Sequence, residues 1–199
     1  MNKGLKDREY WKGIWELFIN GNRLAFNEIY NEYVDFLFAY GMKITPNREL
    51  VQDNIQDLFV NLCKYRKNLT SPDYLEFYLT RSLRRMLIKE VQKNRKVANM
   101  DEEELLSFQL KFDLEEQLIE GESADNRMIS LQKMLASIDS RKRELLYLKF
   151  YSGLNYREIG DLLGIRPDTA KKQVYRLLED LRDRFGQKLM ELFCMYFKV

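Results

Sequence analysis

Histidine is absent from the 199 residues of this sequence. The commonest general base and metal ligand of enzymes is therefore missing, which excludes Ser/His/Asp and Cys/His nucleophile pairs and the H-E-x-x-H zinc site. The two cysteines, Cys63 and Cys194, lie far apart in apolar helical contexts and indicate neither a zinc site nor a disulfide framework. We expect both thiols to be reduced and packed in a core, and we expect no metal, no cofactor and no enzymatic activity.

Glycine and proline are also scarce, at 9 and 3 residues. Most of the chain instead carries apolar residues at spacings of three and four, and strand-type alternation is poor, so the sequence predicts an all-α protein. The most apolar stretch, residues 189–199, is far shorter than the roughly 20 residues needed to cross a bilayer, and the N-terminus has no signal-peptide pattern. We therefore expect a cytoplasmic protein with no membrane insertion.

The net charge of +2 conceals an uneven distribution along the chain. Residues 1–97 carry a net charge of +5, residues 98–126 carry −9, and residues 127–199 carry +6. This pattern predicts two small basic domains, 1–97 and 127–199, joined by an acidic linker at 98–126. The linker is either a solvated connector or a segment that mimics nucleic acid against basic surfaces.

In the first basic block, apolar residues recur at helical spacing in four segments. Before the fourth segment, Ser71 and Pro72 predict an N-cap and a first-turn proline. On the third predicted helix, Asp53, Gln56 and Asp57 lie away from the apolar stripe, so they face solvent or a partner. No cysteine or third clustered carboxylate accompanies them, so this face indicates binding rather than catalysis.

The fourth predicted helix carries an apolar stripe, from Leu79 to Val91, and a basic stripe on the opposite side. The basic stripe consists of Arg81, Arg85, Lys89 and Lys93, and Arg84 adds to it. So much positive charge on one face repels itself, and the usual offset is a polyanion such as a phosphate backbone. The preceding Tyr78 offers a ring on which unpaired bases can stack. The alternative is an ordinary solvated basic face with core aromatics.

The second basic block has the pattern helix, turn, helix, tight turn over residues 143–164, followed by a helix from Pro167. Asn155 is placed to cap the middle helix, Gly160 is small where two helices approach, and Gly164 suits a left-handed turn residue. This is the organisation of a helix-turn-helix, whose second helix enters the major groove. The outward residues near the start of that helix are Lys171, Lys172, Tyr175 and Arg176. A generic three-helix core is the alternative, but the basic helix after the tight turn favours DNA binding.

Together the two blocks resemble the extracytoplasmic-function (ECF) group of the sigma-70 family of RNA polymerase sigma factors. In the first block, residues 20–30 resemble the start of the family's first domain, residues 53–59 its signature helix, and residues 78–85 its −10-binding segment. In the second block, residues 154–160 and 169–176 resemble its −35-binding helix-turn-helix. The resemblance implies a non-enzymatic subunit with a region 2 helical bundle and a region 4 helix-turn-helix, which directs core polymerase to promoters for transcription initiation.

The resemblance also implies roles for individual residues. Core polymerase would bind Asp53, Gln56 and Asp57. The −10 element, held as single strand, would contact Tyr78, Arg81, Arg84, Arg85 and Lys89. The double-stranded −35 element would contact Lys171, Lys172, Tyr175 and Arg176. An anti-sigma factor is a further partner that the resemblance allows.

The sequence departs from the family pattern at several positions. Arg85 stands where the family usually has Asn, and Asp139 where it often has Pro. The apolar tail, residues 189–197, extends past the family pattern, and we expect it to pack against the second domain rather than to bind a partner. Two other interpretations of the whole chain stay open: a stand-alone helix-turn-helix regulator that binds a palindrome as a dimer, and a helical adaptor that binds only protein.

Overall fold

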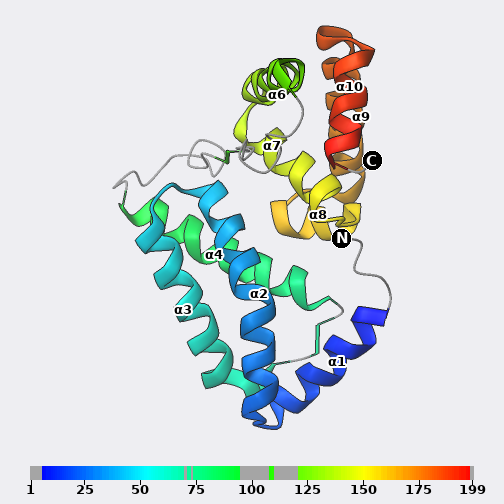
Figure 1. Cartoon of the computed structure of the whole chain (residues 1–199). Coiled ribbons are helices and arrows are strands. Elements are labelled where there is room, and N and C mark those ends of the chain that lie inside the picture. Colours follow the sequence, from blue (N-terminus) through cyan, green and yellow to red (C-terminus); the bar gives the residue numbers. More distant parts are fainter. Residues whose placement is uncertain (1–5, 70, 73, 95–107, 110–120, 198–199) are drawn as a thin grey trace. The chain divides into compact units, whose positions relative to one another are not determined.

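The computed structural model describes residues 6–69, 71–72, 74–94, 108–109 and 121–197. Within these ranges every regular element is a helix and none is a strand (Figure 1). The all-α prediction is therefore confirmed. No helix in the described ranges has both the length and the apolar character that a membrane crossing requires. The chain divides into two compact units, Met1–Leu105 and Leu106–Val199.

The first unit is a bundle of four α-helices with one short 3-10 turn. Its elements are α1 (Lys6–Ile19), α2 (Arg23–Ile44), α3 (Arg48–Tyr65), η1 (Arg66–Asn68) and α4 (Leu75–Asn94). The helix α2 packs against α1, α3 and α4, and α4 also packs against α3. The centre of this bundle is strongly aromatic, because Trp15 and Tyr40 are fully buried and Tyr33 is nearly so.

Asparagines begin two helices of this bundle. The Asn22 side chain accepts hydrogen bonds from the amides of Leu24 and Ala25, and the Asn47 side chain accepts one from Leu50. These bonds satisfy amides that have no partner inside the helix. The predicted start of the fourth helix is wrong, because α4 begins at Leu75 and the Ser71-Pro72 pair lies before it. The buried stripe of α4 starts only at Leu75, and packing of such a stripe supplies most of a helix's stability.

The second unit is built around the predicted helix-turn-helix. Its elements are α6 (Gly121–Ala136), α7 (Ser140–Leu146), a π-helical segment η3 (Tyr147–Tyr151), α8 (Tyr156–Leu163), α9 (Pro167–Phe185) and α10 (Gln187–Phe197). The helix α6 begins inside the range that we expected to be linker. The expected linker residues 98–107 and 110–120 lie outside the described residues.

The core of the second unit gathers apolar side chains from α6, α7, α9 and α10. Its buried members are Leu131, Met134, Leu135, Ile138, Leu146, Leu177, Leu181, Met190 and Phe193. Because Met190 and Phe193 come from α10, the expectation that the apolar tail packs on this domain is confirmed. Both cysteines are free thiols and half-buried, with Cys194 against this core and Cys63 on α3.

Candidate nucleic-acid and protein interfaces

The helix α3 has a buried apolar side and an exposed side that carries carboxylates. Its buried stripe includes Ile55 and Leu58, whereas Asp53, Gln56 and Asp57 are exposed. These three side chains, which we call the carboxylate face, form no hydrogen bond or ion pair with other described residues. The structure therefore brings the three predicted residues together on one open surface, where a partner can reach them.

An exposed valine borders the carboxylate face. Val60 is 54% exposed and lies three residues after Asp57, about one helical turn away. Sequence analysis missed this residue, because a single valine in an apolar helix looks like a core residue. An apolar side chain beside charged ones is the usual make-up of a protein-binding patch.

The two opposed stripes predicted on α4 are present. Leu79, Leu83 and Leu87 are fully buried. On the other side Arg85 and Lys89 are exposed, and Arg81 is half-buried. Lys93 is exposed as well and lies 3.6 Å from Glu90, the one acidic residue near this stripe. We call Arg81, Arg85, Lys89 and Lys93 the basic face of α4.

Arg84 does not belong to that face. It is only 4% exposed, and it takes part in an interaction within the protein. Thr80 and Ile88, one turn before and one turn after it, are 3% and 6% exposed. The prediction that Arg84 contacts DNA is therefore wrong, because the buried side of α4 is two stripes wide and Arg84 lies in the second stripe.

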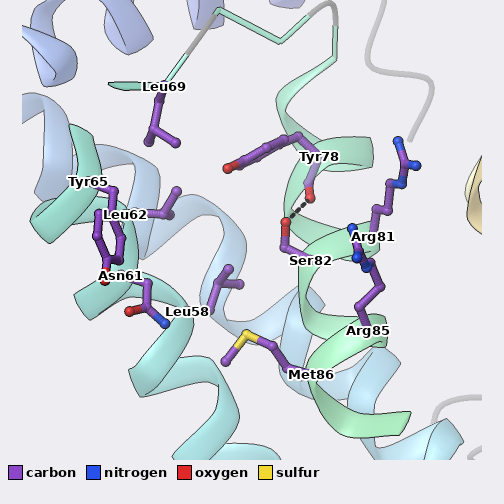
Figure 2. A pocket seen from close by; sticks show the side chains of 10 residues that line it. All are labelled: Leu58, Asn61, Leu62, Tyr65, Leu69, Tyr78, Arg81, Ser82, Arg85 and Met86. Carbon is purple, nitrogen blue, oxygen red and sulfur yellow. Dashed lines mark hydrogen bonds between the residues drawn. The ribbon is translucent and has the colours of Figure 1, made fainter. Parts of the chain in front are cut away.

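A pocket of about 450 Å³ opens between α3 and α4 (Figure 2). This volume lies within the range that small ligands occupy in proteins. Three of the predicted −10 residues line it: Tyr78, Arg81 and Arg85. In Figure 2 the Tyr78 ring points towards α3, and the side chains of Arg81 and Arg85 lie next to each other along α4. The other lining residues are Leu58, Asn61, Leu62, Tyr65, Leu69, Ser82 and Met86.

Two of these lining residues, Asn61 and Tyr65, carry polar groups that sequence analysis did not select. Both are exposed, and with Asp57 they continue one stripe of α3 at steps of four residues. That regular spacing was the available signal. This stripe borders a pocket only because α4 lies opposite α3. The sequence of α3 alone therefore could not show that Asn61 and Tyr65 line a pocket.

The chemistry of this pocket combines rings with fixed positive charge. Burial raises the pKa of the Tyr78 phenol above its ordinary value, so the ring is neutral at pH 7 and carries no charge that would repel phosphate. The Ser82 hydroxyl donates to the Tyr78 carbonyl oxygen at 2.8 Å and so is held in place within the helix. Neutral rings beside guanidinium groups can stack on an unpaired base while the cations contact its backbone.

The second candidate interface begins with the α8 cap. The Asn155 side chain accepts from the amides of Arg157 and Glu158, and the Glu158 carboxylate accepts from the Asn155 amide at 2.8 Å. At the other end of α8, Gly164 adopts the left-handed conformation with φ 68°. Both predicted roles are confirmed, and together they fix the length of α8 and the direction in which the chain leaves it.

The helix α9 presents its predicted contact residues to solvent. Pro167 is at its first turn, as expected, and Ala170 and Val174 face the core. Lys171, Lys172, Tyr175 and Arg176, the α9 contact face, are all exposed. The Lys171 amine lies 6.0 Å from the centre of the Tyr175 ring, which is 60% exposed. Three cations and one ring thus occupy the N-terminal half of the helix, the part that reaches base edges in a helix-turn-helix.

Comparison with known families supports this description of the second unit. Residues 128–181 match the family described as "Sigma-70, region 4". The match extends from within α6 into α9 and so includes α8, the turn after it and most of α9. It ends before α10.

Individual relatives match more of the chain. This chain is 21% identical over 151 residues to the RNA polymerase sigma factor SigV of Bacillus subtilis, and the alignment covers 76% of this chain and 82% of SigV. It is 23% identical over 168 residues to the ECF RNA polymerase sigma factor SigE of Mycolicibacterium smegmatis, covering 84% of this chain and 64% of SigE.

One solved structure has a similar fold. It is the sigma factor RpoE from Bartonella quintana, solved in complex with the anti-sigma factor NepR. The TM-score is 0.50 at 18% identity, and the alignment covers 83% of this chain and 96% of RpoE. The similarity therefore extends over both units and concerns the fold.

Proposed function

The chain belongs to the sigma-70 family, in its ECF group of RNA polymerase sigma factors, and we propose how its two units divide the work of promoter recognition. The first unit, within residues 1–97, binds core polymerase and the −10 element. The second unit, within residues 127–199, binds the −35 element. The observation that carries this proposal is the presence of two differently built basic surfaces on one chain. One is a cationic, aromatic-lined pocket, and the other is a helix-turn-helix.

The carboxylate face of α3 is the proposed contact with core polymerase. Asp53, Gln56 and Asp57 are exposed, and none has a partner among the described residues. An interface at this face gains from opposite charge on the partner, which speeds association and fixes orientation. Val60 beside them adds apolar area that the partner can cover.

The pocket between α3 and α4 is the proposed site for the single-stranded −10 element. In this proposal the rings of Tyr78 and Tyr65 stack on an unpaired base, and Arg81 and Arg85 hold its phosphates. Lys89 continues the basic face one turn beyond Arg85 and extends the path for the strand. Asn61 is positioned to hydrogen-bond a base edge, since bases taken out of the stack expose theirs.

The α9 contact face is the proposed −35 contact. Arg and Lys donate to guanine or to phosphate, and Tyr contacts a thymine methyl group or a phosphate. Lys171 and Lys172 lie in the first turns of α9, where side chains reach the major groove, and Tyr175 and Arg176 follow one turn later. At Gly160 the helix α8 packs closely against the backbone of the turn that leads into α9. This contact fixes the position of α9 relative to α8.

Neither surface is expected to suffice alone. Linking two weak contacts in one chain raises the effective concentration of the second after the first has formed. Polymerase bound to both units would set their separation and thus complete the site. Free protein should therefore bind duplex promoter poorly. An anti-sigma factor is a further partner within this proposal.

The direct test is run-off transcription with purified core polymerase and a library of promoter fragments. We expect this protein to start transcription from a subset of fragments that share two short elements at a fixed spacing. A band-shift assay without polymerase is the companion measurement. Tight, palindrome-specific binding by the free protein would instead indicate a dimeric helix-turn-helix regulator, and no nucleic-acid binding even at low salt would indicate a protein-binding adaptor.

A further inference from the structure

A second pocket lies in the second unit, where α10 packs against α6 and α9. Its volume is about 550 Å³, within the range that small ligands occupy in proteins. The described residues that line it are Ser130 and Lys133 of α6, Arg184 and Phe185 of α9, and Lys188, Leu189 and Leu192 of α10. We call it the α10 pocket. None of these residues belongs to the carboxylate face, the basic face of α4 or the α9 contact face.

Most of the α10 pocket comes from residues that the region 4 match does not include. That match ends at residue 181, whereas five of the seven lining residues, from Arg184 to Leu192, come later in the chain. The similarity to region 4 therefore does not account for the pocket. Its ligand has to be inferred from the side chains themselves.

One part of the lining is apolar and incompletely covered. Phe185, Leu189 and Leu192 pack against the core of the unit, but each is only partly buried. Leu189 and Leu192 are three residues apart and so lie on the same side of α10. An apolar group placed in the pocket would remove their remaining area from water, which favours binding.

The other part of the lining is positively charged. Lys133, Arg184 and Lys188 supply three cations, and no acidic residue is among the described lining residues. Asp180 pairs with Arg184 at 2.9 Å, whereas Lys133 and Lys188 form no ion pair with another described residue. Two positive charges are thus left without a counter-charge, and such an excess attracts an anion.

The third cation, Arg184, is held in one orientation. Its Nη1 atom donates to the Asp180 carboxylate at 2.9 Å, and its Nη2 atom donates to the Ser137 hydroxyl at 2.8 Å. That hydroxyl donates in turn to the Met134 carbonyl oxygen at 2.7 Å. The guanidinium also lies 5.1 Å from the centre of the Phe185 ring. Because this side of the pocket is already ordered, a ligand has less conformational entropy to remove.

We propose that the α10 pocket binds a small amphipathic anion, an alkyl chain with a carboxylate or phosphate head group. The chain covers Leu189 and Leu192, and Lys133 and Lys188 hold the head group. A protein partner fits less well, because a stable protein interface takes about 20–30 residues from each side and the pocket offers seven.

The bound anion would leave the −35 surface open. Arg184 lies eight residues after Arg176, the last member of the α9 contact face, which is about 12 Å along the helix axis. The site is therefore an addition to the proposed promoter contacts and can be tested without DNA.

The experiment is equilibrium dialysis of the full chain against octanoate, decanoate and decyl phosphate, each below the concentration at which it forms micelles. We expect saturable binding of one molecule per chain. Each further methylene group that the pocket buries should tighten binding about fourfold, so decanoate should bind about 16-fold more tightly than octanoate. The ratio between decanoate and decyl phosphate shows which head group the pocket prefers. Decanol, which has the same chain without the charge, should bind severalfold more weakly than decanoate.

Charge reversal tests the site itself. Lys133→Glu and Lys188→Glu should each weaken decanoate binding about fivefold, since both lysines are exposed and partly screened by water. Arg157→Glu reverses an exposed cation of α8 outside the pocket and is the matched control, which should bind decanoate like wild type. The melting temperature of each variant, measured without ligand, shows that it folds.

Three results would overturn the proposal. The first is no saturable binding of any of the three anions by wild type. The second is equal affinity for decanol and decanoate, or unchanged decanoate binding in the folded Lys133→Glu and Lys188→Glu variants, because the cations would then not hold the head group. The third is a Lys133→Glu variant that loses affinity for core polymerase but keeps its affinity for decanoate, which would assign the pocket to a protein partner.

Discussion

A Cβ atom on Gly160 would lie 2.6 Å from the carbonyl oxygen of Ile165. It would also lie 3.2 Å from the backbone nitrogen of Pro167, and the Ile165 amide already donates to the Gly160 carbonyl at 2.9 Å. These atoms belong to the turn that joins α8 to α9, and backbone cannot move aside as a flexible side chain can. The direction in which α9 presents Lys171 and Arg176 therefore depends on the absence of a side chain at residue 160.

Gly160→Ala should thus destabilise the second unit by about 1–3 kcal/mol, the usual cost of overpacking, and should weaken −35 binding. Thermal unfolding and transcription from a fixed promoter measure the two effects. The matched control is Gly13→Ala in α1, where the added methyl group meets nothing within 4 Å. That change should leave stability unchanged or raise it by up to about 1 kcal/mol, since alanine is the better helix former. Equal melting temperatures for the two variants would contradict the proposed tight contact.

Asp57→Arg reverses a charge at the centre of the carboxylate face. Because Asp57 is exposed and has no partner among the described residues, the fold should be kept. Binding to core polymerase should weaken by about 2–5 kcal/mol, the cost of disrupting a charged pair at an interface. Fluorescence anisotropy with labelled protein measures it. Glu16→Arg, a similar reversal at an exposed position of α1, is the control and should bind like wild type.

Lys171→Ala should spare polymerase binding and impair recognition of the −35 element. Loss of a well-placed base contact costs about 1–3 kcal/mol at one position of the site and relaxes the preference there. Transcription from promoters with altered −35 elements, measured at several salt concentrations, distinguishes the loss of a base contact from the loss of a phosphate contact. Loss of a phosphate contact would weaken binding to all sequences equally. Lys188→Ala on α10 removes an exposed lysine outside the α9 contact face and serves as the control. An unchanged promoter preference for Lys171→Ala removes this residue from base recognition.

The local features of the second unit could be predicted because their causes are local. Asn155 caps α8 through amides two and three residues ahead, and Gly164 ends α8 with its own backbone angle. Such features depend on a few neighbouring residues, and the sequence displays them directly. The fold class follows in the same way from apolar spacing.

The error at Arg84 has a different origin. Periodicity gives the direction of each side chain around a helix, but not how wide the buried side is. The helix α4 packs against both α2 and α3, so a second stripe at Thr80, Arg84 and Ile88 is covered as well as the first. The width of a buried face is set by the number of neighbouring helices, which one helix's sequence does not contain.

The pocket between α3 and α4 and the hydrogen bond from Arg143 to the Phe108 carbonyl could not be predicted from sequence patterns. Phe108 and Arg143 are 35 residues apart, and neither belongs to a recognised motif. Tyr65 and Tyr78 likewise line one pocket from the ends of two different helices. These contacts come from tertiary packing, whereas the resemblance to a family identified only the residues within its motifs.

Adjacent arginines on α4 provide a test of this distinction. Arg84→Ala should lower the stability of the first unit by about 1–3 kcal/mol, because it removes a buried charged group and leaves its partners unsatisfied. Arg85→Ala should leave stability nearly unchanged, since Arg85 is exposed, but should weaken binding to single-stranded −10 DNA and flatten its salt dependence. Chemical denaturation and anisotropy with a labelled oligonucleotide measure the two quantities. The opposite assignment, with Arg84 affecting DNA binding and Arg85 stability, would mean that the burial pattern of α4 is wrong.

Asp139 should make the second unit sensitive to acid. Its side chain accepts from the Lys142 amide at 2.8 Å as the N-cap of α7 and pairs with the Lys142 amine at 2.8 Å. Burial by itself raises the pKa of this carboxyl, but the bonds and charge of Lys142 outweigh it and hold the pKa below its ordinary value. The unfolded chain therefore binds the proton more tightly than the folded one. The stabilisation by Asp139 is present above the ordinary pKa of about 3.9 and is lost as pH falls through the lowered folded value.

Asp139→Ala should consequently cost about 1 kcal/mol at pH 7, the typical value of an N-cap, and the difference from wild type should shrink below about pH 4. Asp139→Asn retains an oxygen that can cap the helix but cannot titrate, so it should stay close to wild type at pH 7 and lose less stability in acid. Urea unfolding followed by circular dichroism between pH 7 and pH 2.5 makes the comparison. A stability difference between Asp139→Ala and wild type that is constant over this range would show that the charge of Asp139 contributes nothing to the cap.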